Sequence, residues 1–174
     1  MITRVAVPDD AAEIAQIHVR SWQEADRGLL PQDFLDSLDP AQRTVSWRAS
    51  LAAQTPPTPA AVVITDKQAI LGFARVCPTR DEEEQDKLVG ELSSIYLRPD
   101  TWRQGLGRQL MTHALDLLRE AGNAAATLWV LQGNTRAIAF YEANGWSADG
   151  ALKHATIADV PVTEIRYRIS LLST

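Results

Sequence analysis

"LRPDTWRQGLGRQL", residues 97–110, runs from a strand-like end through Pro99 into two glycines and then into an amphipathic helix. The first turn of a helix leaves several main-chain N–H groups unpaired, and together with the helix dipole they attract an anion. Gly105 and Gly107 would let the oxygens of a pyrophosphate approach closely, and Arg103 and Arg108 could pair with its charge. The stretch therefore predicts a strand–turn–helix unit that binds a phosphate ligand, although a tight turn without a ligand would use the same glycines.

Two common phosphate loops do not fit this stretch. A dinucleotide fingerprint needs a third glycine where Leu110 stands, and a nucleoside-triphosphate loop needs Lys-Ser/Thr where Arg108 and Gln109 follow Gly107. A nucleotide-binding domain therefore remains only as an alternative, which tight binding of ATP or NAD without coenzyme A would favour.

Strands and helices follow one another on both sides of the glycines. Hydrophobic patterns predict helices at about 10–28, at Pro31, at Pro40 and at 106–121, and one capped by Asn134 and stopped by Gly145. In the helix that starts at Pro40, Val45, Arg48, Leu51 and Ala52 share one face. Strands are predicted at 2–7, 60–66, 69–78, 88–99, 125–131, 148–156 and 162–171, with a hairpin at 66–68.

This order indicates an α/β fold. A sheet of about seven strands, antiparallel early and with a strand–helix–strand crossover late, accounts for the pattern. The chain of 174 residues, 45% of them hydrophobic, fits one domain over 1–174. The acidic run 81–86 is expected to be a solvated loop tip, with a lip for a cationic substrate as the alternative.

Composition restricts the partners. A net charge of -5 and a pI near 5.2 argue against nucleic acid, and no apolar run is long enough to span a bilayer. Cys77 is the only cysteine, which excludes an intrachain disulfide and fits a reducing cytoplasm. The three histidines show no metal-ligand spacing, so no metal is expected.

The region 91–146 resembles the GNAT superfamily of acetyl-CoA-dependent N-acyltransferases. Its signature is Q/R-x-x-G-x-G/A followed by N-x-x-A-x-x-F-Y-x-x-x-G-F. The second half is matched by Asn134, Ala137, Phe140, Tyr141, Gly145 and Trp146. Trp102 departs from the usual Gln or Arg at the first signature position, and Arg103 stands where Gly is frequent. The resemblance implies a GNAT-like, mixed and mostly antiparallel sheet flanked by helices.

The resemblance also implies roles for residues. Main-chain groups of Ile95, Tyr96 and Leu97 would align the pantetheine arm, and the amides of Arg103, Gln104, Gly105, Leu106, Gly107 and Arg108 would receive the pyrophosphate. Asn134, Ala137 and Phe140 would contact the coenzyme, with an N-cap as a compatible role for Asn134. Tyr141 would be the general acid that protonates the departing thiolate, and Glu91 the base for the amine. A core tyrosine and an exposed strand carboxylate are the structural alternatives for these two residues.

The expected reaction moves an acetyl group from acetyl-CoA to a primary amine by direct attack. His18 and Trp22, four residues apart on the first helix, are candidates for the acceptor pocket, with a core position as the alternative for Trp22. Gln23, Glu24 and Asp26 at its edge would favour a cationic amine. The acceptor, a small molecule or a peptide, is not identified by the sequence, and a homodimer is one open state of association. A catalytically silent sensor of acyl-CoA is the alternative function, which binding without turnover would indicate.

Overall fold

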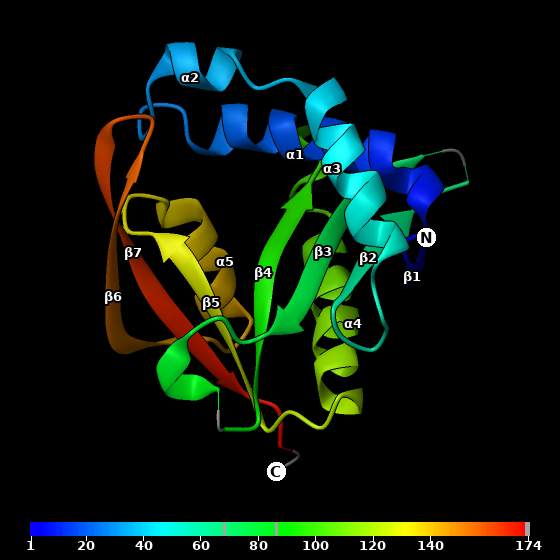
Figure 1. Ribbon diagram of the computed structural model, residues 1–174, viewed down its shortest axis with the longest axis vertical. Coiled ribbons are helices and arrows are strands. Elements are labelled where there is room, and N and C mark those ends of the chain that lie inside the picture. The colour runs from blue at the N-terminus through cyan, green and yellow to red at the C-terminus, as the bar shows by residue number, and fades with distance from the viewer. Residues whose placement is uncertain (68, 86, 173–174) are drawn as a thin grey trace.

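The computed structural model describes residues 1–67, 69–85 and 87–172, which form one seven-stranded sheet with helices on both faces (Figure 1). The strands are β1 (Ile2–Val5), β2 (Ala60–Thr65), β3 (Ile70–Pro78), β4 (Val89–Leu97), β5 (Ala125–Leu131), β6 (Ser147–Ile157) and β7 (Val160–Ser170). The helices are α1 (Ala11–Ala25), α2 (Gln32–Asp36), α3 (Pro40–Ala52), α4 (Leu106–Glu120) and α5 (Thr135–Ala143), with 3-10 turns η1 (Pro8–Asp10), η2 (Glu82–Glu84) and η3 (Pro99–Thr101). Strand order is β1-β2-β3-β4-β5-β7-β6.

One strand pair is parallel and the others are antiparallel. The parallel pair is β4 and β5, and α4 makes the crossover between them, as a parallel pair requires. This arrangement confirms the predicted mixed, mostly antiparallel sheet with a late crossover. The predicted hairpin joins β2 to β3, but Gln68 in its turn lies outside the described residues.

The parallel pair separates soon after it forms. Only Val89, Gly90 and Glu91 of β4 are in register with β5, opposite residues 125–127. Beyond Glu91 the two strands diverge, as Figure 1 shows, while β4 stays paired with β3 up to Leu97. The β5-facing edge of β4 from residue 92 to residue 97 is thus left without a strand partner, directly before the glycine turn.

Each face of the sheet has its own hydrophobic core. On one face α4 packs through residues such as Leu110 and Leu118, together with Leu92 of β4. On the other, α1 and α3 pack over Phe73; this face is called the α1 face below. Successive residues of a strand point to opposite faces, so Glu91, next to Leu92, lies on the α1 face. Tyr96 packs against the core of that same face.

The helix predicted from Pro40 is present as α3. Of the residues predicted to share one face, Leu51 is buried but Val45 is 72% exposed, and Trp47 is the other buried residue of this helix. An indole buries far more apolar surface than a valine side chain, so the helix turns its tryptophan toward the sheet. The first helix also ends earlier than predicted, at Ala25 and not near Gly28, because Asp26 begins a turn whose carbonyl accepts from the N–H groups of Leu29 and Leu30.

The acidic run is not a fully solvated loop tip. Glu84 is 3% exposed, and its carboxylate lies 2.6 Å from Arg168 and 3.5 Å from Arg166. These two arginines alternate along β7 and therefore reach the same face of the sheet. In the sequence, the alternation "RYR" indicates that Arg166 and Arg168 lie on the same face of a strand. It does not indicate which acidic residues they contact.

Candidate functional site

The glycine turn presents a row of unused main-chain donors. No oxygen of the described residues accepts a hydrogen bond from the N–H groups of residues 103–108. Arg103 and Gly105 both have positive φ, 63° and 78°, which shapes the turn before α4 begins. A Cβ built on Gly105 would meet nothing within 4 Å. The turn therefore offers an open concavity of N–H dipoles at a helix N-terminus, which suits a phosphate group.

Gly107 has a different structural role from Gly105. A Cβ at Gly107 would lie 3.0 Å from a ring carbon of Phe140 and 3.4 Å from Leu97. Gly107 thus lets α4 approach α5 closely, and the aromatic ring of Phe140 closes the space beside the turn. The two predicted glycines and Phe140 are brought together by the fold.

Trp102 connects the glycine turn to α5 through side-chain contacts. Its Nε1 donates to the main-chain oxygen of Leu97 at 3.2 Å, and the guanidinium of Arg136 lies 3.8 Å from its ring centroid. That short distance places Arg136 in stacking contact with the indole. Arg136 was not predicted from the sequence. A tryptophan in place of the usual Gln or Arg thus brings a cation from another helix next to the glycine turn.

Side chains of β4 lie both in the α4 core and in the core of the α1 face. Ile95 and Leu97 pack against the α4 core, while Tyr96 faces α1. The Leu97 carbonyl accepts from Ser21 Oγ at 3.1 Å as well as from Trp102. That the main-chain groups of Ile95, Tyr96 and Leu97 align a ligand stays a prediction.

Helix α5 carries Asn134 and Tyr141. Asn134 is the predicted N-cap: its side-chain oxygen accepts from the N–H of Ala137 at 3.1 Å. The Tyr141 ring lies 5.6 Å from that of Phe140 and 6.2 Å from that of Trp146, centroid to centroid. Its hydroxyl has no hydrogen-bond partner among the described residues. Burial, with a smaller effect of Tyr96, raises the pKa of Tyr141 above its usual value, so this phenol keeps its proton.

The alternative interpretation of Glu91 as an exposed strand carboxylate is wrong, because the residue is buried. It is 1% exposed, and Arg80 binds it through the guanidinium and through the main-chain N–H, the latter at 3.1 Å. This contact joins the segment after β3 to β4 on the α1 face. The contact with Arg80 compensates the burial of the Glu91 carboxylate.

Aromatic rings of α1, α3, β3 and β4 line the α1 face. His18 stacks on Tyr96 with ring centroids 5.2 Å apart, and Trp22 Nε1 donates to the Tyr96 hydroxyl at 2.9 Å. His18 Nδ1 accepts from Trp47 Nε1 at 3.2 Å. Burial, aided by the charge of Arg43, lowers the pKa of His18 to about 4, so its ring is neutral at neutral pH. The two predicted acceptor residues, His18 and Trp22, therefore meet at Tyr96.

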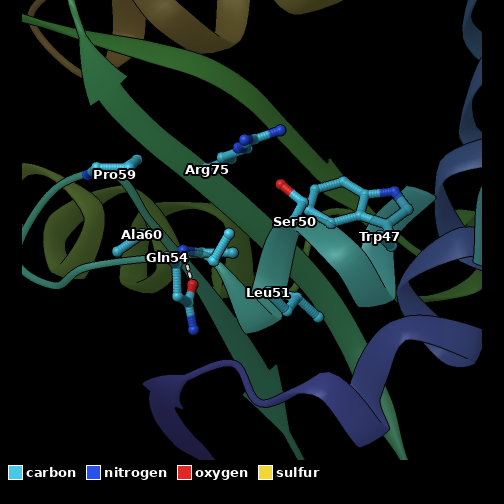
Figure 2. Close-up of a pocket in the computed structure, with 9 residues that line it drawn as sticks. Trp47, Ser50, Leu51, Gln54, Pro59, Ala60 and Arg75 are labelled. Atoms are coloured by element: carbon cyan, nitrogen blue, oxygen red, sulfur yellow. Dashed lines mark hydrogen bonds between the residues drawn. The ribbon is translucent and has the colours of Figure 1, made fainter. Parts of the chain in front are cut away.

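Two cavities lie near these elements. One, of about 300 Å³, lies between the turn after α1 and the start of α5, and is lined by residues 24, 25, 27–29 and 133–136. The other, of about 150 Å³, lies between α3 and the strands β2 and β3, with Trp47, Gln54 and Arg75 around it (Figure 2). Of the predicted site residues, Asn134 lines the first cavity and none lines the second.

Among residues 1–67, 69–85 and 87–172, no group of three or more His, Cys, Asp or Glu side chains is arranged to hold a metal ion. No helix in the described part of the chain is long and apolar enough to cross a membrane.

Known proteins share this sequence pattern and this fold. Residues 12–146 match the family Acetyltransferase (GNAT). The "Uncharacterized N-acetyltransferase YuaI" of Bacillus subtilis is 34% identical over 145 residues, which cover 82% of this chain and 79% of that protein. The "[Ribosomal protein bS18]-alanine N-acetyltransferase" of Escherichia coli is 45% identical over 56 residues, 32% of this chain and 38% of that one.

A solved structure extends the match to the whole fold. The structure of yncA from Salmonella typhimurium, a putative acetyltransferase with its cofactor acetyl-CoA, superposes with a TM-score of 0.73 at 18% identity. The superposition covers 100% of this chain and 95% of that one. The chain therefore belongs to the GNAT family and is an acyl-CoA-dependent acetyltransferase.

Proposed function

We propose that the protein transfers an acetyl group from acetyl-CoA to a primary amine by direct attack of the amine on the thioester. The observation that carries the proposal is the row of unpartnered N–H groups at residues 103–108, beside the unpaired edge of β4. These donors fit a pyrophosphate, and Ile95 and Leu97 of β4 pack against the same core as Tyr141. In the related yncA structure the cofactor is acetyl-CoA, which supports the choice of ligand.

Acetyl-CoA would supply the acetyl group as a thioester. Residues 103–108 would hold its pyrophosphate, with Arg103, Arg108 and Arg136 as cations around it. Ile95, Tyr96 and Leu97 would align its arm through main-chain groups, with Asn134, Ala137 and Phe140 on the other side. Tyr141 would donate its proton to the departing sulfur, since burial keeps its hydroxyl protonated.

A replacement at Gly105 tests the binding of the coenzyme. Gly105→Ala places a methyl group in the open concavity at φ +78°, and we expect it to weaken coenzyme A binding about tenfold or more. Gly122→Ala is the matched control, because Gly122 ends the same helix, has φ +85° and is equally open. Both variants should lose a similar free energy of unfolding, about 1–2 kcal/mol. Titration calorimetry should show weaker binding only for Gly105→Ala; equal affinities in the two variants would place the pyrophosphate elsewhere.

Glu91 is the proposed proton acceptor for the attacking amine. Its side chain lies on the α1 face, as Tyr96 does, but Arg80 engages its carboxylate, so the proton would have to reach it through water. We expect Glu91→Gln to lower kcat roughly tenfold without changing the KM for acetyl-CoA. Steady-state kinetics with the exposed Glu82→Gln as control checks this. An unchanged kcat would remove Glu91 from the reaction.

The acceptor and the catalytic competence are tested together. Thiol release from acetyl-CoA is measured across a panel of amines that includes peptides, since the Escherichia coli relative is named for the alanine of a ribosomal protein. Turnover on at least one amine is expected. Binding of acetyl-CoA without turnover on any of them would instead favour an acyl-CoA sensor.

A cytoplasmic location, a homodimer and the absence of nucleic acid, membrane and metal partners remain predictions.

A further inference from the structure

One cavity on the α1 face contains none of the residues assigned to acetyl transfer. It has a volume of about 150 Å³, lies between the C-terminal end of α3 and the strands β2 and β3, and is called the α3 cavity below (Figure 2). Its lining consists of residues 47, 50, 51, 53, 54, 59–61 and 75. Arg75 is the only charged residue among them, so the lining carries one positive charge and no negative side chain.

The guanidinium of Arg75 has no hydrogen-bonding partner among the described residues. Arg75 lies opposite Ala61 in the sheet, and because Ala61 belongs to the core of the α1 face, the Arg75 side chain extends over that face. The guanidinium lies 5.7 Å from the ring centroid of Trp47. It makes no hydrogen bond and no ion pair with any described residue. A guanidinium has five N–H donors, and those of Arg75 therefore remain available at the α3 cavity.

The two uncharged polar side chains of the α3 cavity differ in what they offer. The Gln54 amide is engaged at both atoms, since Nε2 donates to the carbonyl of Ala6 at 2.6 Å and Oε1 accepts from the N–H of Ala61 at 3.0 Å. The Ser50 hydroxyl makes no hydrogen bond with any described residue. Figure 2 shows the Arg75 side chain extending toward the side of the cavity where Ser50 and Trp47 lie. Arg75 and Ser50 thus provide the unused donors, while Gln54 fixes the end of α3 to the sheet.

The remainder of the lining favours an organic anion over an inorganic one. A carboxylate forms two parallel hydrogen bonds with a guanidinium, and the lining supplies no carboxylate of its own. Trp47 and Leu51 are buried, and together with Pro59 and Ala60 they present apolar surface, which suits hydrocarbon. An apolar cavity of about this volume holds benzene. The α3 cavity therefore matches a benzene-sized molecule that carries one carboxylate.

The end of α3 does not cancel the charge of Arg75. The helix ends at Ala52, and a helix C-terminus carries a partial negative charge of about half an elementary charge. The guanidinium carries a full positive charge, so the α3 cavity stays attractive to an anion.

We propose that the α3 cavity binds a monocarboxylate of about the size of benzoate, at a site separate from that of acetyl transfer. The carboxylate pairs with Arg75 and accepts from the Ser50 hydroxyl, and the hydrocarbon part lies against Trp47 and Leu51. Trp47 also donates through Nε1 to His18 at 3.2 Å. The ligand therefore contacts the indole that holds one of the two predicted acceptor residues.

Benzoate is the probe, and benzamide and inorganic phosphate are the control ligands. Titration of benzoate into the ¹⁵N-labelled protein should shift the indole N–H resonance of Trp47, assigned with Trp47→Phe, and saturate with a Kd of about 1 mM or below. Benzamide lacks the charge and phosphate lacks the hydrocarbon, so each should bind at least about tenfold more weakly. Equal binding of either control ligand, or no saturation by benzoate at about 20 mM, would overturn the proposal.

Two variants test where benzoate binds. Arg75→Met removes the guanidinium and should weaken benzoate binding at least about tenfold, whereas Arg48→Met, at a 55% exposed side chain on α3 outside the lining, should keep the native affinity. Ser50→Met keeps Arg75 but fills part of the α3 cavity, and it should weaken binding to a similar extent. This second variant decides the question if Arg75→Met does not fold. Native affinity for benzoate in a folded Arg75→Met protein, or in Ser50→Met, would overturn the proposal.

Competition with coenzyme A tests whether the site is separate. The affinity for benzoate should be the same without coenzyme A and at saturating coenzyme A, because none of the residues predicted to hold the coenzyme lines the α3 cavity. Displacement of benzoate by coenzyme A would place benzoate in the coenzyme site and would overturn the proposal. Benzoate binding is measured without an acetyl donor, so its outcome does not depend on the proposed acetyl transfer.

Discussion

Replacing Tyr141 by phenylalanine is expected to lower kcat by about 10²–10³ while leaving the KM for acetyl-CoA nearly unchanged. The phenol is the proposed proton donor to the departing thiolate, and phenylalanine keeps the ring while removing that proton. Packing should survive, because the hydroxyl makes no hydrogen bond within the described residues and the ring rests on Phe140 and Trp146. Thiol release at saturating amine measures kcat directly.

Tyr167→Phe is the matched control for this experiment. Tyr167 also lies in the α4 core, but its hydroxyl donates to Glu142 at 3.0 Å and has no proposed catalytic role. We expect its kcat to change less than about tenfold, with a loss of about 1 kcal/mol in the free energy of unfolding. A similar fall in kcat for both variants would show that Tyr141 acts through packing.

The pH dependence of kcat distinguishes deprotonation of Tyr141 from the titration of other groups. Burial raises the pKa of Tyr141 above its usual value of about 10, so this residue should cause no loss of rate between neutral pH and about pH 10. Any alkaline decline of the native enzyme in that range should persist in Tyr141→Phe, measured as kcat against pH. A decline that disappears in the variant would mean that the phenol loses its proton there.

Segments with a strong period and clear boundaries could be predicted from the sequence. The helix from Leu106 begins after a glycine with positive φ, and α5 begins at the Asn134 cap and ends just before Gly145. The strand between them, β5, was predicted with its observed limits, 125–131. In these segments the local signals and the tertiary packing favour the same structure, so the sequence alone is sufficient.

Contacts between side chains of distant segments could not be predicted. Arg80 reaches Glu91 and Arg136 reaches Trp102, yet no periodicity connects the members of either pair. The helix α3 was predicted, but its spacing did not indicate that Trp47 is buried and Val45 exposed, because only packing on the sheet decides between them. These contacts depend on strand register and helix rotation, which a single sequence leaves open.

Replacing Arg166 by methionine should cause the largest loss of stability, about 3–5 kcal/mol in the free energy of unfolding. Arg166 is 8% exposed and lies 3.0 Å from Asp81, 2.6 Å from Glu83 and 2.8 Å from Asp149, with Trp129 beside its guanidinium at 5.6 Å. Methionine would fill part of the space but leave these carboxylates close together without their cation. The loss is measured by urea denaturation at neutral pH.

Arg48→Met shows what an exposed ion pair contributes by comparison. Arg48 lies 3.3 Å from Asp9, but its side chain is 55% exposed and that of Asp9 is 93% exposed, so solvent screens the pair and the expected loss is below about 1 kcal/mol. A comparable loss in the two variants would mean that the charges around Arg166 are solvated and that burial does not determine their contribution. A larger loss for Arg166→Met that shrinks at low pH, where the carboxylates become protonated, would identify the uncompensated negative charges as its cause.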